Sequence, residues 1–245
     1  MMITGICTGH RFIRIITTIN SLSFYQPLPL KLNTMSRINR YADFFPQYEL
    51  EYIVKGPKER TPIRPLEAGE ILPSFHIHKK NIITASDTLK SVNGSLPITQ
   101  LLDRPLVLAF HSIHWNDYGT RRLEDLKDIY ADIRVMGGQL LVATTEDKKL
   151  FDAVTADLQL PFASIWDQHN HIARKAGIYS ATDPIWDRIS GINEDVPVPA
   201  VFVLSPSLKI VYSSVDKWLE GGFSKRDLLS AVYEASQEAS HGIAI

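Results

Sequence analysis

The sequence has very little cysteine: Cys7 is the single one among 245 residues. One cysteine cannot form a disulfide within the chain, and it is too few for a structural zinc site or an iron–sulfur cluster. Redox chemistry that needs two thiols in this chain is therefore excluded. Long apolar runs are also missing, since no stretch reaches the roughly 18 residues of a membrane-spanning helix. We expect no membrane segment.

An excess of either charge is absent as well. The 26 basic and 27 acidic residues leave a formal net charge of -1, whereas a nucleic-acid-binding domain usually carries a basic excess. We therefore expect no nucleic-acid partner. The chain also has no internal repeat and no low-complexity tract, and its 44% hydrophobic content is that of a globular protein with a sizeable core.

Acidic residues are missing from the first 42 positions, which still carry five Arg and Lys residues. This pattern favours an organellar transit peptide, but Met35 also offers an alternative start. We interpret residues 1–34, which include Cys7, as an upstream or disordered extension. A cytoplasmic location is expected, with an organelle as the alternative if residues 1–34 are a genuine transit peptide.

The remaining chain is interpreted as an arm, 35–65, followed by one domain, 66–238. Alternation over 73–78 predicts a half-buried strand, and the apolar runs 106–110 and 140–143 predict central strands. Apolar residues at helical spacing over 123–133 predict an amphipathic helix ended by Gly137 and Gly138.

Further elements follow the second central strand. Thr145 is expected to cap a helix over 150–158, and a short strand over 162–166 precedes a short helix ended by Gly177. The runs 200–204 and 209–212 predict a hairpin, and a capping box over 224–227 opens a last helix. The fold class is α/β, with a mixed central sheet flanked by helices in three layers.

Several segments resemble one family in the correct order. They are 66–70 before Pro73, the strand 106–110 followed by Trp115, Trp166-Asp167 before a short helix, and Val198-Pro199 before a strand. Together they resemble the thioredoxin-fold peroxiredoxins, in particular the alkyl hydroperoxide reductase/thiol-specific antioxidant (redoxin) group. The resemblance implies a thioredoxin-like sandwich and an antioxidant oxidoreductase activity.

The reactive loop of that family departs from its pattern here. Trp115 and Tyr118 fit, but Asn116 stands where the resemblance places the peroxidatic cysteine, and Gly119 where it places the second one. An amide has no titrating group and no thiolate to attack a peroxide. We expect the Asn116 side chain to cap the following helix instead. The resemblance also implies that Pro199 faces this loop.

The chain is therefore predicted to be catalytically degenerate and to bind a small molecule or a redox protein. No cofactor and no bound metal are expected, and the family suggests a homodimer. The predicted ligand-binding residues lie in the loop and opposite it: His111, His114, Trp115, Asn116, Tyr118 and Pro199.

Two alternatives remain open. One is an antioxidant peroxidase whose thiol comes from a partner chain or from Cys7. The other is a metal site built on two histidine pairs, His111 with His114 and His169 with His171. Asp167, Arg174 and Arg226 are weaker candidates, for acid–base chemistry or anion binding, and are interpreted mainly as structural. His76 and His78 share one strand face and are expected at the surface.

Overall fold

The computed structural model describes residues 60–85 and 87–241, which belong to one compact unit, Gly56–Ile245. The predicted extension 1–34, Cys7 and most of the arm lie outside the described residues. The strands are β1 (His76–His78), β2 (Ile82–Thr84), β3 (Ser95–Pro97), β4 (Leu106–His111), β5 (Gln139–Thr144), β6 (Ala163–Trp166), β7 (Ala200–Leu204) and β8 (Ile210–Val215).

The α-helices are α2 (Asp87–Lys90), α3 (Asp117–Val135), α4 (Lys148–Thr155), α5 (His171–Lys175) and α6 (Lys225–His241). Short 3-10 turns join them: η2 (Lys79–Asn81), η3 (Ile98–Leu101), η4 (Ile113–Trp115), η5 (Ala156–Leu158), η6 (Gln168–Asn170) and η7 (Ile185–Asp187). None of the helices in the described part of the chain is long and apolar enough to cross a membrane.

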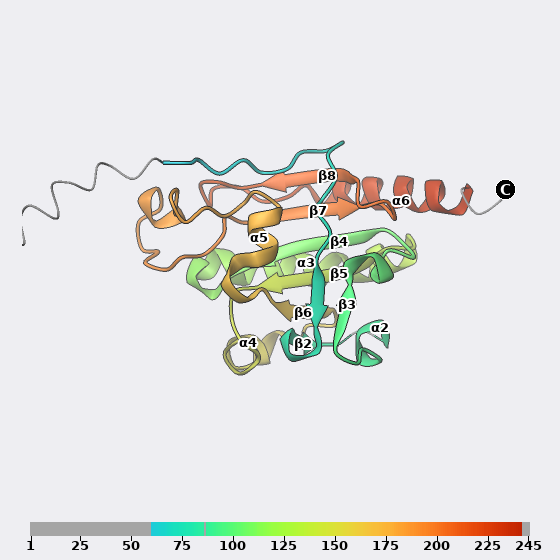
Figure 1. Ribbon diagram of the computed structural model, residues 1–245, viewed down its shortest axis with the longest axis horizontal. Coiled ribbons are helices and arrows are strands. Elements are labelled where there is room, and N and C mark those ends of the chain that lie inside the picture. The colour runs from blue at the N-terminus through green and yellow to red at the C-terminus, as the bar shows by residue number, and fades with distance from the viewer. Residues whose placement is uncertain (1–59, 86, 242–245) are drawn as a thin grey trace, which may run out of the picture. The chain divides into compact units, whose positions relative to one another are not determined.

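Six strands form one mixed sheet in the order β2-β6-β5-β4-β7-β8 (Figure 1). β4, β5 and β6 are parallel, whereas β2, β7 and β8 pair antiparallel with their neighbours. Because β4 is central, all six of its residues are buried, as its continuous apolar run predicts. β1 and β3 form a separate antiparallel pair.

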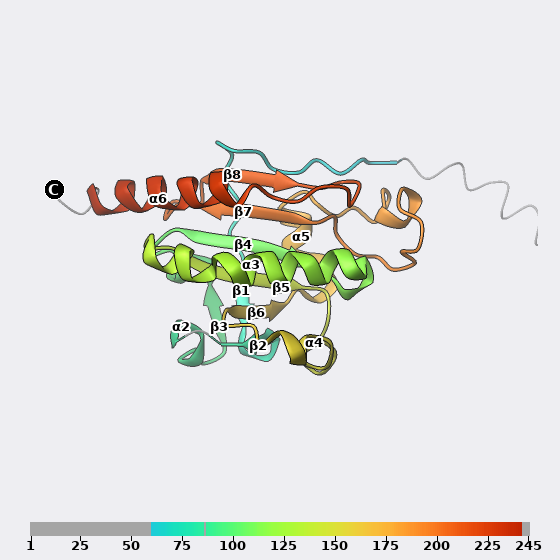
Figure 2. The same cartoon turned by 180° about the vertical axis from the view of Figure 1, so that it is seen from behind.

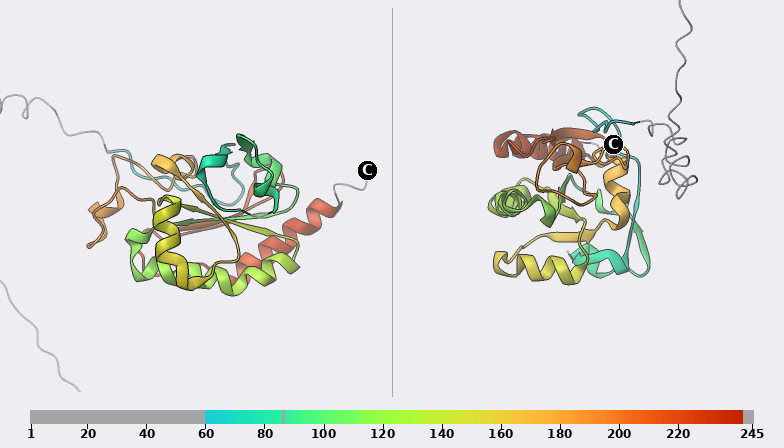
Figure 3. Two further views of the ribbon diagram at one scale, coloured as in Figure 1. Left: turned by 90° about the horizontal axis from the view of Figure 1, so that it is seen from below. Right: turned by 90° about the vertical axis from the view of Figure 1, so that its left-hand side faces the viewer.

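Each face of the sheet has its own core. Alternate residues of β4, such as Val107 and Ala109, pack with α3, α4 and α6 on one face (Figure 2). Leu106, Leu108 and Phe110 face α5, β1 and the segment 178–198 on the other (Figure 1). The helices on one face, the sheet, and the elements on the other face (α5, β1 and the segment 178–198) make three layers (Figure 3). The predicted fold class is confirmed.

Most of the predicted ends of elements are also confirmed. Gly137 follows α3 with φ +83°, and Gly177 follows α5 with φ +70°, conformations that glycine adopts without strain. Ser224 Oγ accepts a hydrogen bond from the Asp227 N–H at 3.3 Å, so the capping box opens α6.

The prediction that Thr145 caps the next helix is wrong. Asp147 is the N-cap residue of α4, and its side chain accepts a hydrogen bond from the Leu150 N–H at 2.9 Å. The carboxylate is one residue before the helix and takes this place. The Thr145 hydroxyl instead contacts Ser112 and Glu146.

Candidate functional site

The loop from β4 to α3 carries the position at which the nucleophile is expected. Asn116 lies between η4 and the first residue of α3, and its side chain is exposed. Its carbonyl oxygen accepts hydrogen bonds from the N–H groups of Gly119, at 2.9 Å, and Thr120, at 3.4 Å. Asn116 therefore begins the first turn of α3, next to the end of the central strand.

The expected side-chain cap is wrong. The Asn116 side chain makes no capping hydrogen bond, and its backbone has φ 52° and ψ -137°. A capping side chain usually requires the extended conformation of the β region, from which it reaches the second or third helical N–H. The positive φ of Asn116 takes its backbone out of that extended region, so the side-chain oxygen does not reach those N–H groups.

Gly119, where the resemblance places the second cysteine, is enclosed. A Cβ atom built on it would lie 2.7 Å from the Ser112 carbonyl oxygen and 3.3 Å from His111 Nε2. A contact of 2.7 Å with a backbone atom requires the main chain to move. Position 119 therefore has no thiol, and the loop has no space for a side chain there.

A buried polar network lies at the ends of β4 and β5. The Glu146 carboxylate accepts hydrogen bonds from the Ser112 hydroxyl at 3.0 Å and the Ile113 N–H at 3.1 Å. The hydroxyls of Thr144 and Thr145 also donate to it. His111 belongs to this network: its Nδ1 lies 3.2 Å from Thr144 Oγ1 and 3.6 Å from Glu146 Oε2.

This network determines the charge of Glu146. Burial raises the pKa of the carboxyl group, but hydrogen bonds from His111, Thr144 and Thr145 outweigh burial and lower the pKa to about 2. Glu146 is therefore ionised at neutral pH although its side chain is only 2% exposed. Sequence reasoning missed it. The signal available was a carboxylate directly after a buried parallel strand.

The aromatic residues of the loop are packed into the core. Trp115 is 2% exposed, and its indole N–H donates to the Pro197 carbonyl oxygen at 3.1 Å. The Tyr118 hydroxyl donates to Asp216 at 2.9 Å, and burial raises the pKa of Tyr118, followed by this hydrogen bond. Pro199 is buried and lines, with Tyr118, a cavity of only about 20 Å³.

A larger cavity, of about 580 Å³, opens where the parallel strands β4, β5 and β6 end. In α/β sheets, ligands commonly bind at the carboxyl ends of parallel strands. His114, half-buried and two residues before Asn116, is the loop residue that lines it. Its other polar lining residues follow β5 and β6 or come from the segment near Asp195: Thr145, Glu146, Asp147, Asp167, Gln168, His169, Asn170, Arg174, Tyr179, Glu194 and Asp195.

Of the weaker candidates, Asp167 has contacts that show a structural role. Asp167 accepts hydrogen bonds from the N–H groups of Ile172 at 2.8 Å and Ala173 at 2.9 Å, so it holds the start of α5 as expected. Burial raises the pKa of Asp167, and these two hydrogen bonds oppose the rise. Arg226 is exposed on α6.

The two histidine pairs do not form the alternative metal site. Within residues 60–85 and 87–241, no three His, Cys, Asp or Glu side chains are arranged to hold a metal ion. His114 and His169 line the same cavity, but His111 is buried in the Glu146 network. His76 and His78 are exposed on one face of β1, as predicted.

Comparisons with known proteins agree on one family and one fold. Residues 69–213 match the model of the AhpC/TSA family. The reduced 2-Cys peroxiredoxin of Plasmodium vivax is 13% identical, with a TM-score of 0.54 over 73% of this chain and 86% of that one. Mycobacterium tuberculosis AhpC is 14% identical, with a TM-score of 0.52 over 74% and 97%.

A third structure, a cysteine-to-serine mutant of the peroxiredoxin 6 of Arenicola marina, is 18% identical, with a TM-score of 0.51 over 68% and 72%. At these identities the structures establish the fold alone. A search of curated proteins found no significant match.

Proposed function

The chain belongs to the AhpC/TSA family, and we propose that it acts by binding a ligand or a partner, without thiol chemistry of its own. The observation that carries this proposal is the loop itself. Asn116 occupies the start of α3, and a side chain at position 119 would overlap the Ser112 carbonyl oxygen at 2.7 Å. Neither of the two positions where the resemblance places a cysteine therefore carries a thiol, and position 119 has no space for one.

The reason is chemical as well as steric. A peroxidase of this type needs a thiolate, which attacks the peroxide oxygen, whereas the Asn116 amide does not ionise.

The binding half of the proposal is supported by the cavity at the ends of β4, β5 and β6. It has about 580 Å³, which is within the range of small-molecule sites. Of the predicted ligand-binding residues, His114 and Asn116 are accessible, whereas His111, Trp115, Tyr118 and Pro199 are buried. We infer that a small molecule or a redox protein contacts the first two, and that the four buried residues hold their loop in place.

Peroxide consumption by the full-length chain tests the chemical half. Hydrogen peroxide is followed with the chain and with Cys7→Ser, each with and without glutathione and with a chelator to remove adventitious metal. We expect no consumption above the protein-free rate in any sample. Consumption that disappears in Cys7→Ser would establish Cys7 as the thiol and overturn the proposal. Consumption retained in Cys7→Ser would also overturn it, because chemistry would then reside elsewhere in the chain.

Assembly and location are further proposals. We infer a homodimer from family membership, and light scattering on the purified chain tests it. A monomer across the concentration range would contradict it. We retain the cytoplasm as the proposed compartment, with an organelle as the alternative. Fluorescence imaging of a carboxyl-terminal fusion distinguishes the two.

A further inference from the structure

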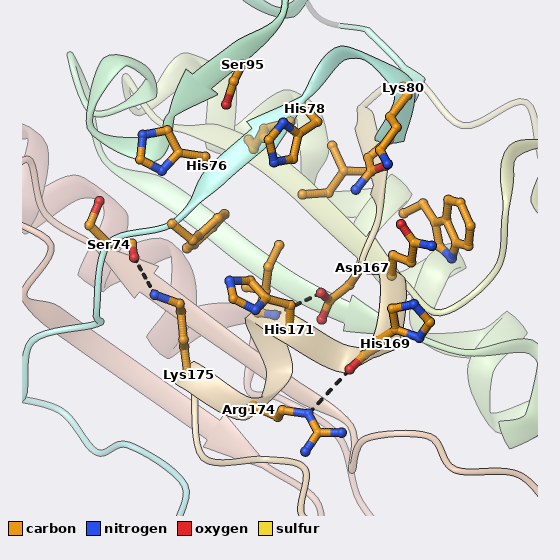
Figure 4. Close-up of a pocket in the computed structure, with 17 residues that line it drawn as sticks. Ser74, His76, His78, Lys80, Ser95, Asp167, His169, His171, Arg174 and Lys175 are labelled. Carbon is orange, nitrogen blue, oxygen red and sulfur yellow. Dashed lines mark hydrogen bonds between the residues drawn. The ribbon is translucent and has the colours of Figure 1, made fainter.

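A second cavity, of about 750 Å³, lies between β1 and the segment formed by η6 and α5 (Figure 4). It shares one wall with the cavity at the strand ends, because Trp166, Asp167, His169 and Arg174 line both. Its own lining comes from β1 and η2 on one side and α5 on the other. Its apolar lining is provided by side chains that are otherwise buried: Phe75, Ile77, Ile165 and Ile172.

The polar lining is dominated by groups that are positive or can become positive. Four of the chain's eight histidines line this one cavity, together with Lys80, Arg174 and Lys175. Figure 4 shows His76, His78 and Lys80 on one side of the cavity and His171 and Lys175 on the other, whereas the Arg174 guanidinium lies below His169 and points away from the β1 side.

Compensating negative charge is scarce. Asp167 is the one acidic residue that lines the cavity, and both of its carboxylate oxygens are already bound, by the N–H groups of Ile172 and Ala173. Among the described residues, Lys80, Arg174 and Lys175 take part in no ion pair. Asp167, which interacts electrostatically with His171, is therefore the one counter-charge in the cavity lining, and the three Lys and Arg side chains outnumber it.

Two of the cations are held in position. The Lys175 ammonium donates to the Ser74 carbonyl oxygen at 2.6 Å, and the Arg174 Nε donates to the His169 carbonyl oxygen at 3.3 Å. The Arg174 guanidinium also lies over the Tyr179 ring, 4.6 Å from its centroid. His169 and Asn170 have φ of 59° and 54°, a left-handed backbone that costs free energy and persists where the surroundings impose it.

We propose that this cavity binds a small organic anion, a carboxylate or a phosphate monoester with an apolar body. The oxyanion lies between Lys80 on the β1–η2 wall and Lys175 on the α5 wall, and the apolar body lies against Ile77 and Ile172. Carboxylate and phosphate share this recognition chemistry, since both accept charge-assisted hydrogen bonds from ammonium and guanidinium groups. This inference goes beyond the proposed function, because it assigns a second site, which His114 and Asn116 do not line, and names its class of ligand.

Isothermal titration and histidine-detected NMR on the full-length chain test the inference. The probes are phenyl phosphate, benzoate, inorganic phosphate and the neutral benzyl alcohol. We expect phenyl phosphate or benzoate to bind with a Kd on the order of 1 mM or tighter, and benzyl alcohol to bind at least about tenfold more weakly. The affinity for inorganic phosphate shows how much of the binding free energy comes from the oxyanion without the apolar body.

A matched pair of charge reversals locates the site. Lys80 is exposed and has no hydrogen bond or ion pair that would make it structural among the described residues, so Lys80→Glu should fold and weaken binding about tenfold or more. Lys149→Glu changes the net charge equally on exposed α4, outside the cavity, and should change the Kd less than about twofold. The imidazole NMR signals of His76 and His171, which line the cavity, should shift when phenyl phosphate is added.

Each contrary result overturns the inference. Absence of binding by both anionic probes at about 10 mM, equal binding of benzyl alcohol, or equal losses in Lys80→Glu and Lys149→Glu would each do so. The peroxide assay separates this failure from that of the proposed function. Peroxide turnover refutes the proposed function whatever the probes do, whereas absent turnover with no anion binding refutes this inference alone.

Discussion

Replacing Gly119 by alanine tests whether the loop has closed around the position of the second cysteine. Gly119 lies inside α3, where alanine is ordinarily favoured over glycine by about 0.5–1 kcal/mol. Here the new Cβ would lie 2.7 Å from the Ser112 carbonyl oxygen and 3.3 Å from His111 Nε2. Overlap in a packed core costs about 1–3 kcal/mol or more. The overlap therefore outweighs the helix preference, and we expect a net loss of about 1–2 kcal/mol.

The matched control is Gly221→Ala. The Cβ atom built on Gly221 meets only Asp216 Oδ2, at an ordinary 3.7 Å, and the residue is exposed. Its unfolding free energy should change by less than about 0.5 kcal/mol.

Urea unfolding followed by circular dichroism gives the two free energies, and a thermal scan should place Gly119→Ala about 2–8 °C below the parent chain. Gly119→Cys, which restores the family's second cysteine, should lose at least as much stability because Sγ extends further. A Gly119→Ala chain as stable as the parent would refute the closed loop.

The remaining predictions concern three polar residues. For Glu146, the shift in pKa from 4.5 to about 2 corresponds to about 3 kcal/mol of stability. Because the folded pKa is the lower one, this contribution is complete above pH 4.5 and is lost as pH falls toward 2. Glu146→Gln should thus destabilise the chain at pH 7, and the gap in urea midpoints should narrow below pH 4.5; a constant gap would contradict it. For Asp167, the folded pKa is the higher one, so its ionisation lowers the stability of the fold as pH rises through the folded pKa. Its two hydrogen bonds from the N–H groups of α5 remain at pH 7. Asp167→Ala should therefore cost about 1–3 kcal/mol at pH 7, and a cost below about 0.5 kcal/mol would show that α5 does not need it. Asn116→Cys should give a thiol with a pKa below the ordinary 8.5, because it begins α3, and an alkylation rate with an ordinary pH profile would contradict that.

The sequence predicts the regular elements well because their patterns are local. The apolar run of β4 and the helical spacing of α3 depend on burial, and burial is periodic in sequence. The pairing of β1 with β3 and the position of β2 at the sheet edge are not predictable in this way. Both strands of the pair have three residues, too few to show a period, and their partners are set by the tertiary fold.

The position of the loop between β4 and α3 could be predicted from the sequence, but its detailed conformation could not. Asn116 lies where the order of the segments put it, next to the end of β4, yet its backbone conformation reversed the expected role of its side chain. The Glu146 network joins residues more than 30 positions apart, so no local motif could reveal it. The cavity of Figure 4 likewise combines β1 with α5, segments that the sequence separates by about 90 residues.

These features together imply that restoring one thiol would not restore a catalytic cycle. A thiolate at position 116 could attack a peroxide once, giving a sulfenic acid and releasing water or an alcohol. Completing the cycle then needs a second thiol to form a disulfide with the oxidised one. Position 119 cannot supply it, because a side chain there overlaps the Ser112 carbonyl oxygen. Asn116→Cys, combined with Cys7→Ser, should therefore consume at most about three equivalents of peroxide per chain, as its one thiolate passes through sulfenic and sulfinic to sulfonic acid, unless an external thiol is added. Repeated turnover without such a thiol would mean that another group of this chain reduces the sulfenic acid, and that the missing second thiol is not what separates this chain from a peroxidase.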